Sequence, residues 1–327
     1  MDRFVLGLDG GGTKTHCALY DLEGNRADVV ELGPTNHEVL KCGFDELRST
    51  LAQLFNQIEE RNGIRRDQII KGVFGMAGVD TKEQHRVISA MLREMGLRDF
   101  ILCNDAYLGV KAGTPEGYGI CVVNGTGCCV CGIDRTGRML QVGGQGVLTG
   151  DLAGGMVIGQ NAISSVYGQL FRCGEKTCLT ELLFEKLGAT SKYDFMDRVI
   201  SAVDTEVIKM QDLNKMVFQA ANMGDKVAVS ILTGAGSELA ASVNGILQEL
   251  ELSEEEEIPV VLAGSINLKG DNPALLDTLK DGIRSKNKDR SIHFIPLNVP
   301  PVMGAIRWAL EGVLGKEDAG RKFFTHG

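Results

Sequence analysis

The spacing of apolar and polar residues in the first third of the chain predicts a complete α/β unit. Val5, Leu6 and Leu8 lead a strand into a glycine run, after which residues 15–20 resume a strand pattern. Apolar residues from Phe44 to Ile58 recur at helical spacing and predict an amphipathic helix over 44–61. The other expected elements are strands over 26–32, 70–75 and 100–103 and a helix over 84–95.

The same pattern then begins again. A strand over 119–123, a glycine turn and a strand over 128–133 repeat the opening hairpin; Gly10 aligns with Gly125, Asp21 with Asp134 and Gly24 with Gly137. One internal duplication explains these matches. We therefore expect a first lobe over 1–117 and a second over 118–302 with a helical insertion at about 160–223. The second lobe also holds a helix over 227–250 and a strand over 259–263, and a closing helix within 303–327 is expected to pack back on the first lobe.

Composition narrows the class of protein. The 327 residues are 43% hydrophobic and 24% charged, as in soluble globular proteins. The net charge of -9 disfavours a nucleic-acid partner. The N-terminus resembles no signal peptide and no apolar run could span a bilayer, so we expect no membrane partner and a cytoplasmic location. Nine cysteines, an odd count, suit free thiols in a reducing compartment.

The first candidate for chemistry is the run Asp9-Gly10-Gly11-Gly12-Thr13-Lys14. Glycines with positive φ would let several N–H groups converge on phosphate oxygens, and Thr13 could add a hydroxyl. Asp9 could hold Mg²⁺ through water. The P-loop pattern is absent, and a dinucleotide fingerprint would continue as a helix, whereas this chain returns as a strand. By itself the run could also be a plain glycine hairpin.

A second glycine turn, Gly125-Thr126-Gly127, strengthens the phosphate interpretation. Two related hairpins, one in each lobe, are what a fold needs to hold a triphosphate. Leu262-Ala263-Gly264-Ser265 could pass under an adenine ring because glycine permits close backbone approach, and Gly304-Ala305 could line the same pocket. An ordinary strand-to-turn junction is an equally good explanation of Gly264 and Ser265.

Two carboxylates are candidates for handling an acceptor. Asp105 follows an apolar strand and precedes a helix, where a general base could reach a hydroxyl; its alternative role is to cap that helix. Asp151 lies in Gly143–Gly155, which holds too many glycines for a regular element, and could bind substrate hydroxyls or simply form a turn.

These motifs together resemble the BadF/BadG/BcrA/BcrD and N-acetylglucosamine kinase family of the actin/hexokinase/Hsp70 superfamily, over nearly the whole chain. The resemblance implies an α/β fold of two duplicated ribonuclease H-like lobes flanking a nucleotide cleft, with ATP and Mg²⁺ as cofactors and a homodimer as the assembly. It implies Asp105 as the catalytic base. Its expected sugar contacts are Asn36, Gly78, Asp105, Gly144 and Asp151, and its expected ATP contacts are Asp9, Gly10, Gly11, Gly12, Thr13, Lys14, Gly125, Thr126, Gly127, Gly264 and Ser265.

The expected activity is ATP-dependent phosphorylation of an amino sugar, N-acetylglucosamine to its 6-phosphate, with glucosamine, N-acetylmuramic acid or glucose as alternative acceptors. Cys128 and Cys129 stand where the family usually has a serine, and Gln145, Leu152 and Gly154 depart from the pattern near the sugar. Two rivals are an iron–sulfur activator of 2-hydroxyacyl-CoA dehydratases and a non-catalytic sugar sensor. Because Cys128 and Cys131 would lie on opposite faces of a strand, buried thiols explain the cysteines better than a cluster.

Overall fold

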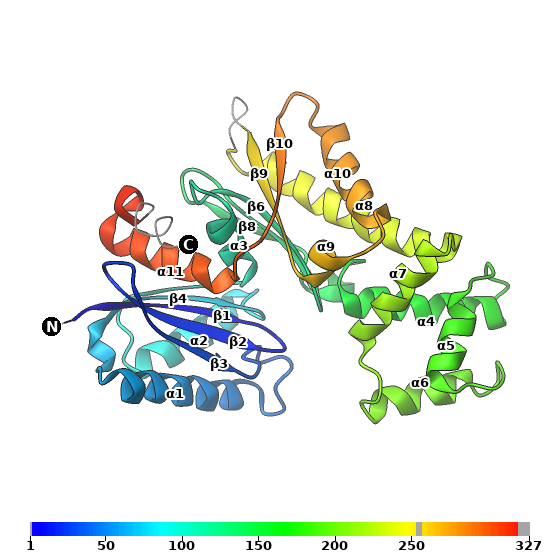
Figure 1. Cartoon of the computed structure of the whole chain (residues 1–327), viewed down its shortest axis with the longest axis horizontal. Helices are drawn as coiled ribbons and strands as arrows, with labels where there is room; N and C mark the ends of the chain where they lie inside the picture. The colour runs from blue at the N-terminus through cyan, green and yellow to red at the C-terminus, as the bar shows by residue number, and fades with distance from the viewer. Residues whose placement is uncertain (1, 253–256, 320–327) are drawn as a thin grey trace. The chain divides into compact units, whose positions relative to one another are not determined.

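The computed structural model describes residues 2–252 and 257–319 (Figure 1). Its described residues form two compact units, one of 2–121, 131–139 and 295–319, the other of 122–130 and 140–294. Residues 320–327 of the expected closing helix lie outside the described part. Within that part, no helix has the length and apolar character required to cross a bilayer.

The first sheet holds the strands that the apolar pattern predicts. Its order is β3-β2-β1-β4-β5, with β1 antiparallel to β2 and parallel to β4, and β4 parallel to β5. The strands are β1 (Phe4–Gly10), β2 (Thr15–Asp21), β3 (Arg26–Leu32), β4 (Ile69–Met76) and β5 (Phe100–Cys103). All five had been predicted, to within a residue or so at each end.

Helices cover both faces of this sheet (Figure 1). Because side chains alternate along β1, Leu6 and Leu8 join the core under helices α1 (Gly43–Asn62) and α2 (Lys82–Glu94), while Val5 faces the opposite core. That second core contains α3 (Ala106–Gly113) and α11 (Pro301–Leu314). A Cβ on Gly7 would lie 2.9 Å from the Ala305 Cβ, so the glycine permits the close approach of α11.

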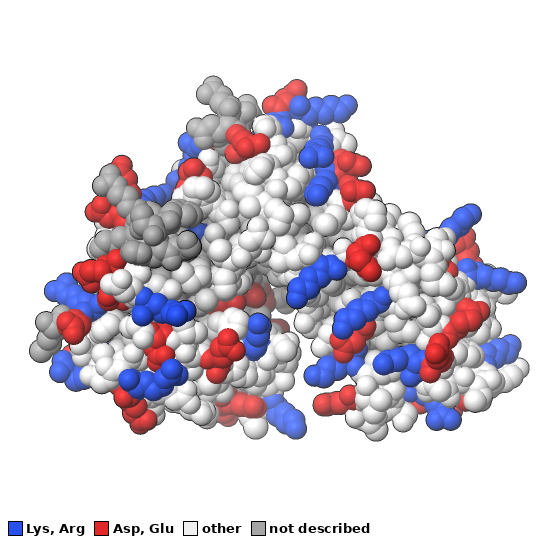
Figure 2. Space-filling view, in the orientation of Figure 1, with Lys and Arg blue, Asp and Glu red and all other residues white. Residues whose placement is uncertain are grey.

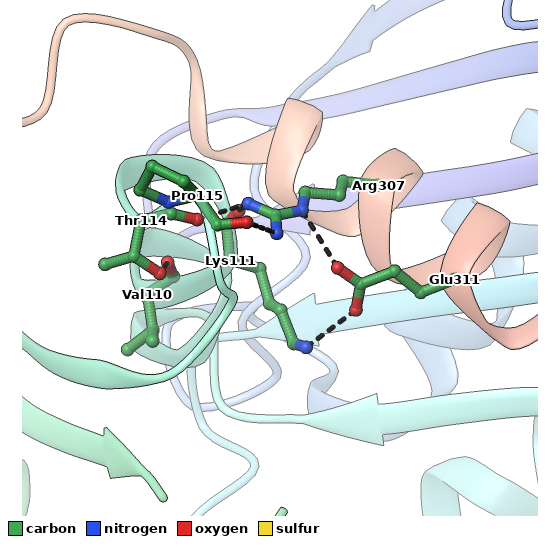
Figure 3. A network of polar contacts seen from close by, with 6 residues as sticks. All are labelled: Val110, Lys111, Thr114, Pro115, Arg307 and Glu311. Carbon is green, nitrogen blue, oxygen red and sulfur yellow. Dashed lines mark hydrogen bonds and ion pairs between the residues drawn. The ribbon is translucent and has the colours of Figure 1, made fainter. Parts of the chain in front are cut away.

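A buried polar network joins α11 to the end of α3 (Figure 3). Glu311 accepts hydrogen bonds from Arg307 Nε at 2.9 Å and from Lys111 Nζ at 2.8 Å. Arg307 also donates to the carbonyl oxygens of Lys111, Thr114 and Pro115. Lys111 and Thr114 lie at the C-terminal end of α3 and Pro115 follows it, so Arg307 caps α3 while Glu311 balances its charge.

The second sheet repeats the first. Its order is β10-β9-β6-β7-β8, so numbering the strands of each sheet along the chain gives 3-2-1-4-5 in both. This confirms the predicted duplication. The strands are β6 (Gly119–Asn124), β7 (Cys128–Ile133), β8 (Met139–Val142), β9 (Ile258–Ala263) and β10 (Ile292–Pro296). Every residue of β7 is buried, including Cys128, Cys129 and Cys131, which confirms that these are buried thiols.

Helices make up most of the rest of the second unit. The predicted long helix is α8 (Lys226–Glu249), whose first turn is capped by Asp225 through the Ala228 N–H at 2.9 Å. The helix over 274–286 had no counterpart in the sequence prediction. The remaining helices of this unit are α4 (Gly155–Phe171), α5 (Leu179–Leu187), α6 (Phe195–Asp204), α7 (Asn214–Asn222), α9 (Ser265–Lys269) and α10 (Ala274–Lys286), with single turns η2 (Gly146–Leu148) and η3 (Met210–Leu213). A further turn, η1 (Arg66–Gln68), belongs to the first unit. On the face seen in Figure 2, acidic and basic side chains are interspersed.

Candidate active site

The strand register of the first sheet brings Asp9 and Asp105 to the same edge. Asp9 pairs with Gly75 of β4, which in turn pairs with Cys103 of β5. Asp105 lies two residues beyond Cys103, and the three strands are parallel, so both carboxylates occupy the carboxyl ends of neighbouring strands. This edge is where α/β sheets place ligands.

The first loop, residues 11–14, joins β1 to β2 as predicted. Gly11 N donates to Lys14 O at 3.0 Å, and Gly12, Thr13 and Lys14 are exposed at the tip. The predicted reason for its glycines was wrong, because none of Gly10, Gly11 and Gly12 has a positive φ. Space is the reason at Gly10, where a Cβ would lie 2.4 Å from Thr35 Oγ1.

Asn36 and Gly78 lie together beside this loop. Thr35 N and Asn36 N both donate to Gly11 O, and Ala77 N donates to Gly10 O at 2.8 Å. Gly78 has φ +80°, and a Cβ there would lie 2.5 Å from Asn36 Oδ1. The loop, the segment of Asn36 and the end of β4 therefore form one packed group.

His37 belongs to the same group, although the sequence assigned it no role. Its ring stacks on Phe44 with centroids 4.1 Å apart, and its Cε1 lies near Gly78. Burial lowers the pKa of His37, opposed by Glu38 and Asp80. Its Nδ1 is buried without a hydrogen-bond partner among the described residues, so the neutral ring has a polar atom to offer a ligand.

Asp105 begins α3 but does not cap it with its side chain. Asn104 does so instead, because its Oδ1 accepts from Ala106 N at 2.9 Å. Asn104 Nδ2 donates to Asp80 Oδ1 at 2.8 Å. The alternative role considered for Asp105 is thus filled by its neighbour, and the Asp105 carboxylate is left available for chemistry.

Burial raises the pKa of both carboxylates, and neighbouring negative charge adds to the effect at Asp105. The pKa of Asp105 is raised from 3.8 to about 7, mainly by burial and further by the charges of Asp9 and Asp80. Burial also raises the pKa of Asp9 to about 6, against the lowering effect of Lys14. A carboxyl that titrates near neutral pH beside a second carboxyl is suited to accept a proton.

The second loop, residues 125–127, joins β6 to β7. Gly125 N donates to Gly127 O at 2.9 Å, and Thr126 and Gly127 are exposed. Here too the glycines have no positive φ, and a Cβ on Gly125 or Gly127 would meet nothing within 4 Å. The glycines leave open space above the backbone, which is room that a phosphate could use.

Asp151 organises the glycine-rich segment in which it lies. Its Oδ2 accepts from Gly144 N at 3.0 Å and Gly146 N at 2.8 Å, and its Oδ1 accepts from Thr149 Oγ1 at 2.8 Å. Positive φ occurs at Gly143, Gly144, Gly146, Gly150 and Gly154, as a segment without regular structure requires. The carboxylate therefore forms a turn, and one lone pair of Oδ1 remains for another donor.

The turn after β9 packs directly on the second loop's strand. Gly264 has φ +87°, and a Cβ there would lie 2.3 Å from Asn124 O. Buried Asn267, which the sequence did not single out, receives a hydrogen bond from Asn124 Nδ2 at 3.2 Å and donates to Val122 O at 3.0 Å. Two buried asparagines thus fix Gly264 and Ser265 beside the second loop.

These residues open into a pocket of about 470 Å³ in the second unit. It brings together Gly125, Thr126 and Ser265, three of the predicted nucleotide contacts. Other residues that line the pocket were not predicted, because they belong to no recognisable sequence motif. They are Gln211, Asp212, Asn214, Lys215, Phe218, Ile266, Lys269, Gly270 and Asp271. The prediction that Gly304 lines this pocket was wrong, since Gly304 packs on α3, where a Cβ would lie 2.2 Å from Leu108 O.

In the described part of the chain, no three His, Cys, Asp or Glu side chains lie close enough together to hold a metal ion by themselves. Asp9 and Asp105 nevertheless offer the oxygen donors that Mg²⁺ prefers. Two such carboxylates at the same edge of the sheet, with Asp9 leading into the first loop, fit a magnesium ion.

The two sheets with the same strand order form the fold of the actin/hexokinase-like sugar kinases. Solved structures share it: the ROK hexokinase of Thermus thermophilus superposes with a TM-score of 0.60 at 18% identity, covering 95% of this chain and 99% of that one. Residues 6–309 match the model of the BadF/BadG/BcrA/BcrD ATPase family, so the chain belongs to that family.

Two curated relatives extend the comparison. The chain is 27% identical over 319 residues to the N-acetyl-D-glucosamine kinase of Dictyostelium discoideum, covering 94% of this chain and 98% of that protein. It is 29% identical over 266 residues to the N-acetylmuramic acid/N-acetylglucosamine kinase of Clostridium acetobutylicum, covering 81% of this chain and 86% of that protein.

Proposed function

We propose that this protein transfers the γ-phosphate of ATP to the 6-hydroxyl of an amino sugar, N-acetylglucosamine first among them. The observation that carries the proposal is the Asp105 carboxylate, which does not cap α3 and whose pKa is raised to about 7 by burial and by the nearby charge of Asp9. Family membership and the names of both relatives support the reaction type. Glucosamine, N-acetylmuramic acid and glucose are the alternative acceptors.

Asp105 is the proposed general base. It accepts the proton of the sugar hydroxyl as that oxygen bonds to phosphorus, and a base with a pKa near the working pH does this efficiently. Asn104 holds the first turn of α3 and so fixes the Asp105 backbone. Asn36, Gly78, Gly144 and Asp151 are the proposed sugar contacts, with the remaining lone pair of Asp151 Oδ1 accepting from a hydroxyl.

ATP is the proposed donor, held through residues of both glycine loops. In the second unit, the pocket beside Gly125, Thr126, Gly264 and Ser265 would take the nucleoside end, and exposed N–H groups of the loop would meet phosphate oxygens. Asp9 would hold Mg²⁺ through water; the ion, when bound, neutralises charge on the phosphates. The first loop, Gly10 to Lys14, contributes the other phosphate contacts.

An ADP-release assay over a panel of hexoses and amino sugars tests the proposal. We expect turnover with N-acetylglucosamine, and we expect Asp105→Asn to lower kcat by orders of magnitude while leaving sugar affinity near normal, since the isostere removes the base alone. Asp99→Asn is the control, because Asp99 is exposed and pairs with Lys71. Wild-type turnover by Asp105→Asn, or no turnover with any sugar, would refute the assignment.

The oligomeric state and the cellular location are likewise proposed from the resemblance to the family. We infer a homodimer acting in the cytoplasm, and size-exclusion chromatography with light scattering tests the dimer. The iron–sulfur activator gains no support from the cysteines, because Cys128, Cys129 and Cys131 are buried in β7.

A further inference from the structure

A second hollow, of about 420 Å³, is lined mainly by arginine. It lies in the first unit, where η1 precedes β4 and where the turn after α2 leads to β5. The lining residues are Arg65, Arg66, Asp67, Arg93, Gly96, Leu97 and Arg98. We call it the arginine pocket.

The arginine pocket is separate from the candidate active site. Arg66 and Arg98 stand just before the parallel strands β4 and β5, whereas Gly78 and Asp105 stand just after them. Parallel strands begin at one edge of a sheet and end at the other. With eight residues in β4 at about 3.3 Å each, the two edges are roughly 26 Å apart.

The walls of the arginine pocket are held in place. Arg66 donates to Met95 O at 3.0 Å and to Glu59 at 2.8 Å, and its guanidinium lies 4.2 Å from the centre of the Phe55 ring. Gly96 takes φ +91° to turn the chain after α2, and buried Leu97 anchors the turn in the core. These contacts fix Arg66 and the turn after α2, whereas the side chains of Arg93 and Arg98 are exposed to solvent.

Positive charge is in surplus at this pocket. Each carboxylate nearby already has a cation: Glu59 pairs with Arg66, Asp67 with Arg65, Glu94 with Arg48 and Asp99 with Lys71, at 2.6 to 3.0 Å. Arg93 only stacks on the Phe100 ring, 5.6 Å from its centre. In the described part of the chain, neither Arg93 nor Arg98 has a hydrogen bond or ion pair from its side chain, and Arg98 meets only the charge of Asp67, which Arg65 already pairs, so both guanidinium groups keep their donors for a ligand.

We propose that the arginine pocket binds the phosphate group of a small phosphorylated molecule. A guanidinium presents paired N–H donors that match two oxygens of a phosphate, and two such groups on one concave surface suit a doubly charged anion. A long polyanion fits less well, because the chain carries a net charge of -9 and carboxylates surround the hollow.

Calorimetric titration of the full chain with pyrophosphate tests this proposal. ADP is kept saturating so that the phosphate loops are occupied, and ionic strength is held constant. We expect saturable binding that the double variant Arg93→Gln/Arg98→Gln weakens at least about tenfold, since two charge-assisted hydrogen-bonding groups are lost. Arg86→Gln is the matched control: Arg86 is exposed on the same helix but bonds Glu83 and does not line the pocket, so its affinity should stay within about twofold.

Parallel titrations with inorganic phosphate, a hexosamine phosphate and a single-stranded oligonucleotide identify the ligand class. Binding of any phosphate compound that is lost in the double variant supports the proposal and ranks its ligands. Pyrophosphate affinity unchanged by the double variant overturns it, as does an oligonucleotide that binds more tightly than every small phosphate. None of these measurements depends on turnover, and the decisive comparison uses pyrophosphate, so they stand apart from the kinase assay.

Discussion

Asn104 donates its Nδ2 to the Asp80 carboxylate at 2.8 Å, and this one hydrogen bond connects the end of β4 to the residue preceding the proposed base. With its Oδ1, the same amide caps α3 through Ala106 N. Asn104 thus holds a second carboxylate close to Asp105 and fixes the turn on which Asp105 stands. Burial is the main cause of the raised pKa of Asp105, and Asp80 adds to it, so Asn104 contributes to both the acidity and the position of the base.

Asn104→Asp should change both properties. The carboxylate cannot donate to Asp80, and its charge lies beside those of Asp80 and Asp105, so the pKa of Asp105 should rise further. We expect the pH profile of kcat/KM to move to higher pH and stability at pH 8 to fall by about 1 to 3 kcal/mol. Asn62→Asp, a partly buried amide on α1 remote from the site, controls for general damage. An unmoved pH profile would contradict this role of Asn104.

Asp105 also predicts a dependence of activity and stability on pH. Since its pKa in the folded protein is about 7, kcat/KM should rise with pH through that value as the base loses its proton. In the unfolded chain the pKa is near 3.8, so between about pH 4 and pH 7 the folded state binds more protons than the unfolded one, and this group's contribution makes the protein less stable as pH rises.

Asp105→Asn should therefore raise the melting temperature at pH 8 and change it little at pH 4, where the aspartate is protonated in the folded state. Thermal unfolding of both proteins at the two pH values measures the effect. Equal shifts at both pH values would show that the raised pKa is not the cause.

Gly78→Ala should weaken sugar binding. The new Cβ would lie 2.5 Å from Asn36 Oδ1 in a backbone conformation that disfavours side chains, so Asn36 must move. We expect the KM for sugar to rise severalfold with the KM for ATP nearly constant, and stability to fall by about 1 to 3 kcal/mol. Gly137→Ala is the matched control, because Gly137 has φ +88° but open space around it. A Gly137→Ala enzyme with the same rise in sugar KM would rule out crowding of Asn36.

Glu311→Gln should destabilise the first unit. The glutamine cannot balance the charges of Arg307 and Lys111, whose side chains are 3% and 6% exposed. Breaking a buried ion network at one member costs about 3 to 5 kcal/mol, measurable by urea denaturation. Glu317→Gln, exposed just beyond α11, should cost almost nothing. A small loss at Glu311 would mean that water reaches the network of Figure 3.

The sequence predicted the helices and strands with strong periodicity and the loops with unusual composition. The glycine loops, Asp105 and α8 were all placed correctly along the chain. β8, β10, α9 and α10 were not foreseen: β8 and β10 are short strands at the two edges of the second sheet, where burial is only partial and alternation is weak. Asn104 and Asn267 were not assigned roles because amide hydrogen bonds between distant segments leave no periodic trace. The role of Gly10 could be explained only from the structure. A side chain there would clash with Thr35, whereas the backbone φ of Gly10 is one that any residue can adopt.

The packing of α11 against β1 has a consequence for synthesis. Tyr20 of β2 donates to the sulfur of Met303 in α11, 283 positions further along the chain. On the ribosome, the apolar face of the opening hairpin stays without its partner until α11 has been translated, and contacts so distant in sequence close slowly. We expect nascent chains that stop before α11 to recruit chaperones, whereas chains that include α11 can complete the first unit.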